Sequence, residues 1–162
     1  MESFSVREIP KLIVSILIPL IIGFASAFLT FSSFPAFYAT LNKPSWSPPV
    51  WLFGYVWTVL YILNGIALFL VWREGLGRRD VQIAIGVFAI QIILNFFWSI
   101  IFFGFRSLSG GLIEIIIMWI AILINIILFY RISKAAGILL IPYIIWVTIA
   151  SYLNYTVFLL NP

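Results

Sequence analysis

Residues 81–105 read VQIAIGVFAIQIILNFFWSIIFFGF, a run that contains no charged side chain. A helix needs about 20 predominantly apolar residues to cross the hydrocarbon core of a bilayer. The run is long enough to do so, and it therefore predicts a membrane-spanning helix.

Comparable stretches lie on both sides of this run. Residues 12–42, 44–72 and 135–162 carry no charge, and residues 107–130 carry only Glu114. They predict an all-α integral membrane protein, a bundle of five transmembrane helices that forms one domain over residues 1–162. We expect the helices at about 10–30, 48–72, 81–103, 112–130 and 137–159, with a long first loop over 31–47.

The overall composition agrees with a lipid environment. Hydrophobic residues make up 64% of the chain and charged residues 9%, whereas a soluble domain has about 25% charged residues. The chain has no Cys and no His, which excludes disulfides, the usual zinc sites, His-ligated haem and Ser-His or Cys-His nucleophile pairs. We expect no metal, no bound cofactor and no nucleic-acid partner.

The basic residues indicate an orientation. With five spans, seven of the nine Lys and Arg residues fall on the side of the N-terminus, and only Lys43 and Arg106 fall on the other side. Because cytoplasmic loops are enriched in Lys and Arg, the sequence predicts an internal N-terminus and an external C-terminus. A prokaryotic cytoplasmic membrane is the favoured setting.

Local signals suggest where individual helices begin. Ser47 reads as an N-cap with Pro48 at the first helical position, and Asp80 as a cap of the third helix. Pro19 is expected to kink the first helix. Glu114 is expected in the first turn of the fourth helix, where a carboxylate interacts favourably with the helix dipole.

Polar and aromatic residues form stripes along four of the helices, because spacings of three and four place side chains on one helical face. Such stripes either hold helices together or wall a cavity for a large, flat, mostly apolar ligand. The stripes are Phe53, Trp57, Tyr61 and Asn64; Gln91, Asn95, Trp98 and Phe102; Glu114, Met118, Ala121 and Asn125; and Tyr143, Trp146, Ala150 and Asn154.

The first helix carries a pair of small residues, Gly23 and Ala27, four positions apart. Small residues at this spacing allow helices to approach closely. The motif is consistent either with a homodimer or with packing inside one chain.

Several motifs resemble those of one family. Residues 43–49, KPSWSPP, are similar to the KPSWxPP signature of the tryptophan-rich sensory protein and translocator protein family, TspO/MBR. Residues 57–61 resemble its W-x-x-L-Y element, residues 94–99 its L-N-x-x-W-S element, and residues 142–146 its P-Y-x-x-W element. The elements occur in the family's order and cover nearly the whole chain.

The resemblance implies a membrane receptor or sensor that binds tetrapyrroles such as protoporphyrin IX in a cavity closed by the long first loop. It implies a role for Trp57 and Trp146 in light-dependent porphyrin breakdown, if that reaction occurs. The expected ligand-binding residues, from the resemblance and the stripes together, are Trp46, Pro48, Phe53, Trp57, Tyr61, Gln91, Asn95, Trp98, Tyr143, Trp146 and Ala150.

The composition bears on the ligand as well. A porphyrin presents an apolar face for stacking on indoles and phenols, and Lys43, Tyr61 and Asn95 are candidate polar contacts. Without His or Cys, metal-free porphyrin is a better candidate than haem. The cholesterol motif of animal members ends in a basic residue, and no Lys or Arg follows Tyr155 here, which counts against sterol recognition.

Three other functions compete with a receptor. They are a light- and oxygen-dependent porphyrin-degrading enzyme, a transporter of porphyrin or another lipophilic ligand, and a scaffold. The sequence shows no inverted repeat and no cation in mid-helix, features that would favour a transporter.

Overall fold

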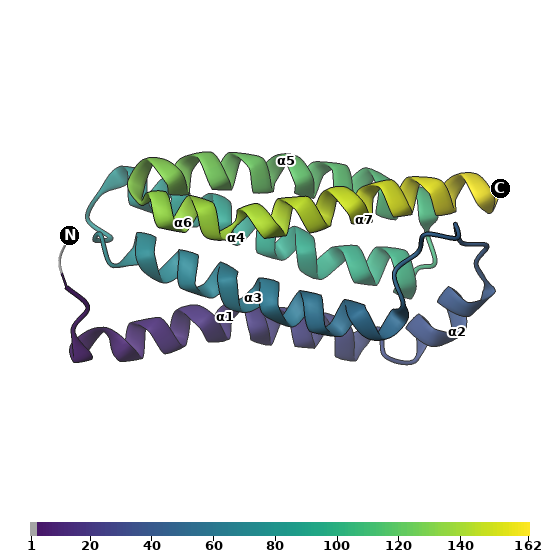
Figure 1. Cartoon of the computed structure of the whole chain (residues 1–162), viewed down its shortest axis with the longest axis horizontal. Helices are drawn as coiled ribbons and strands as arrows, with labels where there is room; N and C mark the ends of the chain where they lie inside the picture. The colour runs from purple at the N-terminus through teal and green to yellow at the C-terminus, as the bar shows by residue number, and fades with distance from the viewer. Residues whose placement is uncertain (1–2) are drawn as a thin grey trace.

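The computed structural model describes residues 3–162 as long helices that run up and down along a common axis (Figure 1). Five segments of this described range are long and apolar enough to cross a membrane. The elements are η1 (Val6–Glu8), α1 (Ile9–Leu29), α2 (Ser33–Thr40), α3 (Val50–Trp72), α4 (Arg79–Ser99), η2 (Ile100–Gly104), α5 (Leu108–Ile132), α6 (Lys134–Leu139) and α7 (Ile141–Leu160).

Helix ends follow local sequence chemistry at several positions. Pro10 and Pro142 lie in the first turns of α1 and α7, where the missing N–H costs no hydrogen bond. The Ser107 side chain caps α5 by accepting a hydrogen bond from Gly110 N, and Ser133 caps α6 in the same way. Pro19 lies inside α1, which continues through it from Ile9 to Leu29.

The structure corrects the expected caps of two helices. Ser47 and Pro48 precede α3, which begins at Val50 with Pro49 as its N-cap. Asp80 does not cap α4 from outside, because α4 begins at Arg79 and Asp80 lies in its first turn. There its carboxylate accepts a hydrogen bond from Val81 N at 3.0 Å.

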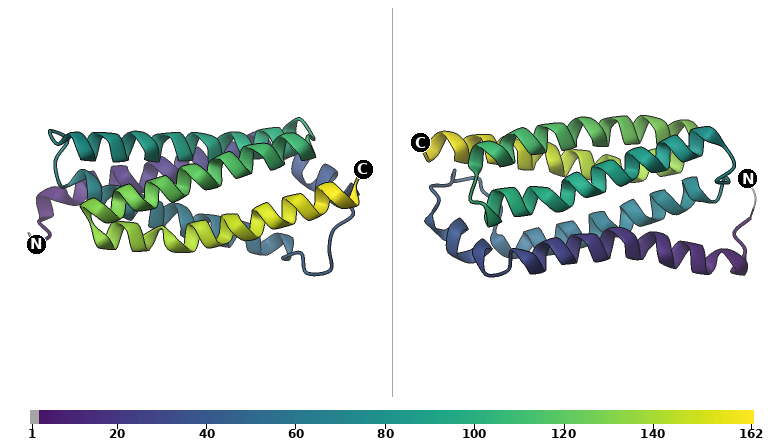
Figure 2. Two further views of the ribbon diagram at one scale, coloured as in Figure 1. Left: turned by 90° about the horizontal axis from the view of Figure 1, so that it is seen from above. Right: turned by 180° about the vertical axis from the view of Figure 1, so that it is seen from behind.

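The expected loop over residues 31–47 is partly helical. It contains α2, which lies across the end of the bundle at which the chain terminates (Figures 1 and 2). Aromatic side chains of α2 explain its position: Phe34 packs against Phe103 with ring centroids 4.7 Å apart, and Tyr38 is buried.

The spans form a ring in the order α1, α3, α6–α7, α5 and α4. Close approach of α1 and α3 depends on Gly65, because a Cβ at this position would meet the α1 backbone at Ser15 and Ile16. α3 packs against α6, the first part of the fifth span, whereas α7 packs mainly against α5. The ring is therefore tightest at the end opposite α2.

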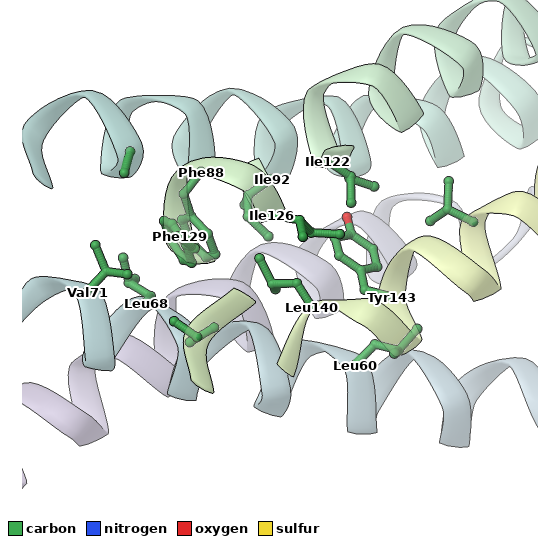
Figure 3. Close-up of a cluster of buried hydrophobic side chains, with 14 of the residues drawn as sticks. Leu60, Leu68, Val71, Phe88, Ile92, Ile122, Ile126, Phe129, Leu140 and Tyr143 are labelled. Carbon is green, nitrogen blue, oxygen red and sulfur yellow. The ribbon is translucent and has the colours of Figure 1, made fainter. Parts of the chain in front are cut away.

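The main core fills that tighter part of the ring. Tyr143 of α7 lies beside Ile122 and Ile126 of α5, and Phe88 stacks on Phe129 with ring centroids 5.8 Å apart (Figure 3). All five of these side chains are at most 8% exposed. They fix the distance between α4, α5 and α7.

The outer surface of the spans is apolar. Exposed side chains such as Ile21, Phe28, Ile113 and Tyr152 are each more than 60% exposed, which water would penalise and lipid does not. The chain is an integral, multi-pass membrane protein whose outer face lies in the bilayer. Its charged residues gather at the ends, where Glu8 pairs with Arg73 at 3.1 Å.

Candidate ligand-binding cavity

A cavity of about 400 Å³ lies inside the ring at the α2 end. It receives side chains from α1, α2, α3, α4, η2, α5 and α7, and its volume falls in the usual range for small-molecule sites. Among the described residues, its lining includes no charged side chain. The site is therefore suited to a mostly apolar ligand.

Seven of the expected site residues lie on the cavity wall. They come from three helices that are adjacent in the ring or face one another across it. They are Phe53, Trp57, Tyr61, Asn95, Trp98, Trp146 and Ala150.

Gln91 and Tyr143 lie behind this wall. Both side chains are fully buried, and neither lines the cavity. The Tyr143 hydroxyl donates to Gln91 Oε1 at 2.8 Å and accepts a hydrogen bond from Asn95 Nδ2 at 3.0 Å. Their contact with the cavity is therefore indirect, through Asn95.

Trp46 and Pro48 also lie outside the lining. Trp46 stacks on Tyr152 of α7, with ring centroids 5.2 Å apart and an interplanar angle of 17°. This contact attaches the loop after α2 to the outer side of α7. Closure of the cavity itself comes from α2, through Phe34 and Tyr38.

The indole groups on the wall are held in different ways. Trp98 Nε1 donates to Asn154 Oδ1 at 3.2 Å, and Asn154 Nδ2 donates to Leu108 O at 3.2 Å. Trp57 stacks on Tyr61 with ring centroids 5.7 Å apart. Trp146 Nε1 is buried and has no hydrogen-bond partner among residues 3–162, so only packing holds this ring.

Trp146 also borders a second hollow. An apolar groove between α3 and α7 is lined by Val56 and Val59 on one side and by Ile145 and Ile149 on the other, with Trp146 at its base. Val59, Ile145 and Ile149 are exposed, so the groove faces lipid. Trp146 is therefore shared by the linings of the groove and the cavity.

Lys43, a candidate polar contact for the ligand, instead holds α2. Its ammonium group donates to Tyr38 O at 2.8 Å and Leu41 O at 3.0 Å, and lies 4.6 Å from the centroid of the Tyr38 ring. Burial raises the pKa of the Tyr38 phenol above its ordinary value. The Tyr38 hydroxyl is buried and has no partner within the described chain.

The expected position of Glu114 was wrong. α5 begins at Leu108, so Glu114 lies beyond the first turn and is buried. Both of its carboxyl oxygens lack a hydrogen-bond partner among residues 3–162. The helix dipole therefore does not explain Glu114, because its effect is confined to the first turn.

Several wall residues were not expected from the sequence. α1 contributes Phe24 and Ala27, and α2 contributes Phe34 and Tyr38. Met118 of α5 belongs to a predicted stripe but was not among the expected binding residues.

The buried face of α1 carries Ser15, Gly23 and Ser26 at helical spacing, a signal that the sequence contained and the predicted stripes did not include, and residues 33–40 were assigned to a loop. The four-residue spacing of Phe34 and Tyr38 was a usable signal for α2, because it places both rings on one face of a helix. In the structure the two rings stack with their centroids 5.4 Å apart.

One member of the small-residue pair of α1, Gly23, packs closely within the chain. The Tyr61 ring lies directly over Gly23, where a Cβ would overlap it. Ala27 lines the cavity. Packing inside one chain therefore accounts for Gly23, whereas Ala27 is exposed.

Comparison with known proteins gives the family. A model described as the TspO/MBR family matches residues 15–160. The chain belongs to the TspO/MBR family. The match covers all the helices that build the cavity, apart from the first turns of α1.

Individual TspO/MBR members resemble the chain over most of its length. It is 46% identical to "Tryptophan-rich protein TspO" of Chlorobaculum tepidum, covering 96% of this chain and 99% of the relative. It is 45% identical to the protein of the same name in Archaeoglobus fulgidus, covering 95% and 99%. It is 37% identical to the human "Translocator protein", covering 74% and 72%.

Proposed function

We propose that this TspO/MBR protein is a membrane receptor or sensor that binds a tetrapyrrole such as protoporphyrin IX in the cavity beneath α2. The observation that carries the proposal is the composition of the wall. Trp57, Trp98 and Trp146 line an uncharged space together with the polar side chains of Tyr61 and Asn95. Aromatic rings favour stacked or edge-to-face contacts with a flat aromatic ligand.

Family membership supports the same proposal. The relatives include proteins named tryptophan-rich sensory protein and CrtK. We also propose a prokaryotic cytoplasmic membrane as the location, with the N-terminus inside, because the basic residues are concentrated at that end. A homodimer stays a proposal as well, and the buried position of Gly23 gives it no support.

A substitution inside the cavity tests the proposal. Ala150 lines the cavity, whereas Leu159 on the same helix is 57% exposed and borders neither the cavity nor the groove. Ala150→Phe should fill the space and weaken protoporphyrin quenching of tryptophan fluorescence in lipid nanodiscs by more than tenfold. Leu159→Phe is the matched control and should leave the affinity unchanged. Equal affinities of both variants and the wild type would refute binding in this cavity.

Light- and oxygen-dependent porphyrin breakdown is a second candidate. One observation favours it: Trp57 and Trp146 both line the cavity, so a bound porphyrin would lie close to two oxidisable indoles. Trp57→Phe or Trp146→Phe should then lower the photoproduct yield in aerated light far more than the affinity. A proportional fall in both quantities would make the tryptophans part of the wall only.

A further inference from the structure

Five buried side chains form a continuous hydrogen-bonded chain from the core to the cavity, and we call this chain the amide relay. Its members come from α3, α4 and α7 and are each at most 8% exposed. They are Asn64, Gln91, Tyr143, Asn95 and Tyr61. Only Asn95 and Tyr61 line the cavity.

The direction of the relay is set at Asn64. Asn64 Nδ2 donates to the backbone oxygen of Leu60 at 2.9 Å. The opposite orientation would place two oxygens together, because a carbonyl only accepts hydrogen bonds. Asn64 must therefore turn its Oδ1 towards Gln91, whose Nε2 donates to it at 3.0 Å.

The orientation of Asn64 fixes the orientation of the next members of the amide relay. With its Nε2 directed to Asn64, Gln91 presents Oε1 to Tyr143, which donates its hydroxyl proton at 2.8 Å. A phenol has one proton, so the Tyr143 oxygen can only accept from its other neighbour. Asn95 Nδ2 donates to it at 3.0 Å.

The last step reaches the cavity. Because Asn95 directs Nδ2 to Tyr143, its Oδ1 faces Tyr61, and the Tyr61 hydroxyl donates to it at 3.0 Å. The single proton of Tyr61 is thus committed to Asn95. Asn95 itself keeps one N–H, whereas Tyr61 offers the cavity only the lone pairs of its oxygen.

We propose that Gln91 and Asn64 are positioning residues that determine ligand specificity without touching the ligand. Through the amide relay they make Tyr61 a hydrogen-bond acceptor, which selects flat apolar ligands that carry an N–H or O–H donor over ligands of the same shape that carry a carbonyl. A metal-free tetrapyrrole, with pyrrole N–H groups, belongs to the selected class. The inference rests on the proposed binding function of the cavity.

Removing Gln91 should reverse the last two links. In Gln91→Leu the Tyr143 hydroxyl loses its acceptor and donates instead to Asn95 Oδ1. The Asn95 amide then turns its Nδ2 to the Tyr61 oxygen, and the Tyr61 proton becomes free to point into the cavity. This arrangement leaves Tyr143, Asn95 and Tyr61 all partnered, as buried polar groups usually are. Tyr61 would then be a donor.

Carbazole and fluorenone are suitable probes because both are flat tricyclic molecules, one with an N–H donor and the other with a carbonyl acceptor. Their dissociation constants are measured in nanodiscs by competition with protoporphyrin IX. One hydrogen bond contributes about 0.5–1.5 kcal/mol, so the wild type should bind carbazole roughly two- to tenfold more tightly. Gln91→Leu should bind fluorenone more tightly than carbazole.

The control variants separate the relay from general damage. Asn125 accepts a second hydrogen bond from Gln91 Nε2 at 3.4 Å and is fully buried, but the anchor at Asn64 does not depend on it. Asn125→Leu should therefore keep the preference for carbazole. Tyr61→Phe removes the hydroxyl that the relay orients, so adding Gln91→Leu to this variant should no longer reverse the ratio of the two affinities. If Gln91→Leu does not fold, Tyr143→Phe is used instead, and it should bring the two affinities close together.

An unchanged carbazole preference in Gln91→Leu, or in Tyr143→Phe, would overturn the inference while leaving the binding site intact. So would equal affinities for the two probes in the wild type. Protoporphyrin binding without binding of either probe would also overturn it, because Tyr61 would then make no selective contact. Failure of protoporphyrin itself to bind would refute the proposed function.

Discussion

The side chain of Asn161 forms two hydrogen bonds with the backbone of Asn42, 119 positions earlier in the chain. Asn161 Oδ1 accepts from Asn42 N and its Nδ2 donates to Asn42 O, each at 2.9 Å. These bonds join the segment after α2 to the residue that follows α7. Since α2 closes the cavity, they hold the closing segment in place.

Asn161→Ala should therefore accelerate ligand exchange. We expect association and dissociation rates of protoporphyrin, followed by stopped-flow fluorescence, to rise several-fold with little change in affinity, because neither residue lines the cavity. Asn42→Ala is the matched control: it keeps both backbone groups and loses only the bond from Asn42 Nδ2 to Leu160 O at 3.4 Å. Equal exchange rates in all three proteins would show that α2 does not control access.

Gly23→Ala should both destabilise the bundle and weaken ligand binding. A Cβ at Gly23 overlaps the Tyr61 ring, and overpacking of this kind costs about 1–3 kcal/mol. Gly86, which has no neighbouring atom within 4 Å of an added Cβ, supplies the control: Gly86→Ala should stabilise α4 by up to about 1 kcal/mol. Thermal unfolding in detergent gives both values, and a stable Gly23→Ala variant with normal binding would contradict the packing.

Glu114→Met should raise the thermal midpoint. The carboxyl group is buried with both oxygens unpartnered, and a buried polar group in this state costs about 1–3 kcal/mol. Glu74→Met is the control, because the Glu74 side chain is 44% exposed and lies 3.8 Å from Arg78, so its change should be small. A lower midpoint for Glu114→Met would mean that the carboxyl group makes a stabilising contact.

Tyr38→Phe should make the protein less sensitive to alkali. Burial raises the pKa of the Tyr38 phenol above its ordinary value, so the folded state favours the protonated form. Its contribution to stability is complete below about pH 10, the unfolded pKa, and is lost as the pH rises further. Between about pH 8 and pH 11, the unfolding midpoint should fall less steeply with pH in the variant than in the wild type. Identical slopes would contradict this role.

The orientation can be tested with reporter fusions. A reporter after Pro162 should be external, and one inserted near Gly77 should be cytoplasmic, because basic residues are concentrated at the end of the bundle that contains Gly77. Alkaline phosphatase and green fluorescent protein fusions distinguish the two locations. Both reporters on the same side would contradict the five-span topology.

The sequence predicts the membrane spans well and the exact starts of the helices less well. The five spans follow from apolar length alone, which is why residues 81–105 suffice to predict a span. The start of α5 was expected at 112, because adjacent glycines such as Gly110 and Gly111 are typical of turns. In the structure they continue the helix, and Gly111 packs closely against Phe102, a tertiary contact that no local pattern contains.

In the candidate site, too, features within one helix could be predicted and contacts between helices could not. Helical spacing correctly placed Trp57 and Tyr61 on one face, and the structure brings both to the cavity. Spacing within one helix carries no information about partners on another helix. The bond between Tyr143 and Gln91 depends on how α7 approaches α4, so the sequence could not separate residues on the wall from residues behind it.

Trp146 contributes to the cavity and also to the lipid-facing groove between α3 and α7. Whatever hydrocarbon fills that groove is in contact with the same indole that the cavity presents to its ligand. A detergent tail and a phospholipid acyl chain differ in length, branching and mobility. The amphiphile chosen for purification thus becomes a component of the binding equilibrium, and affinities obtained in micelles and in native-like bilayers describe two different chemical systems.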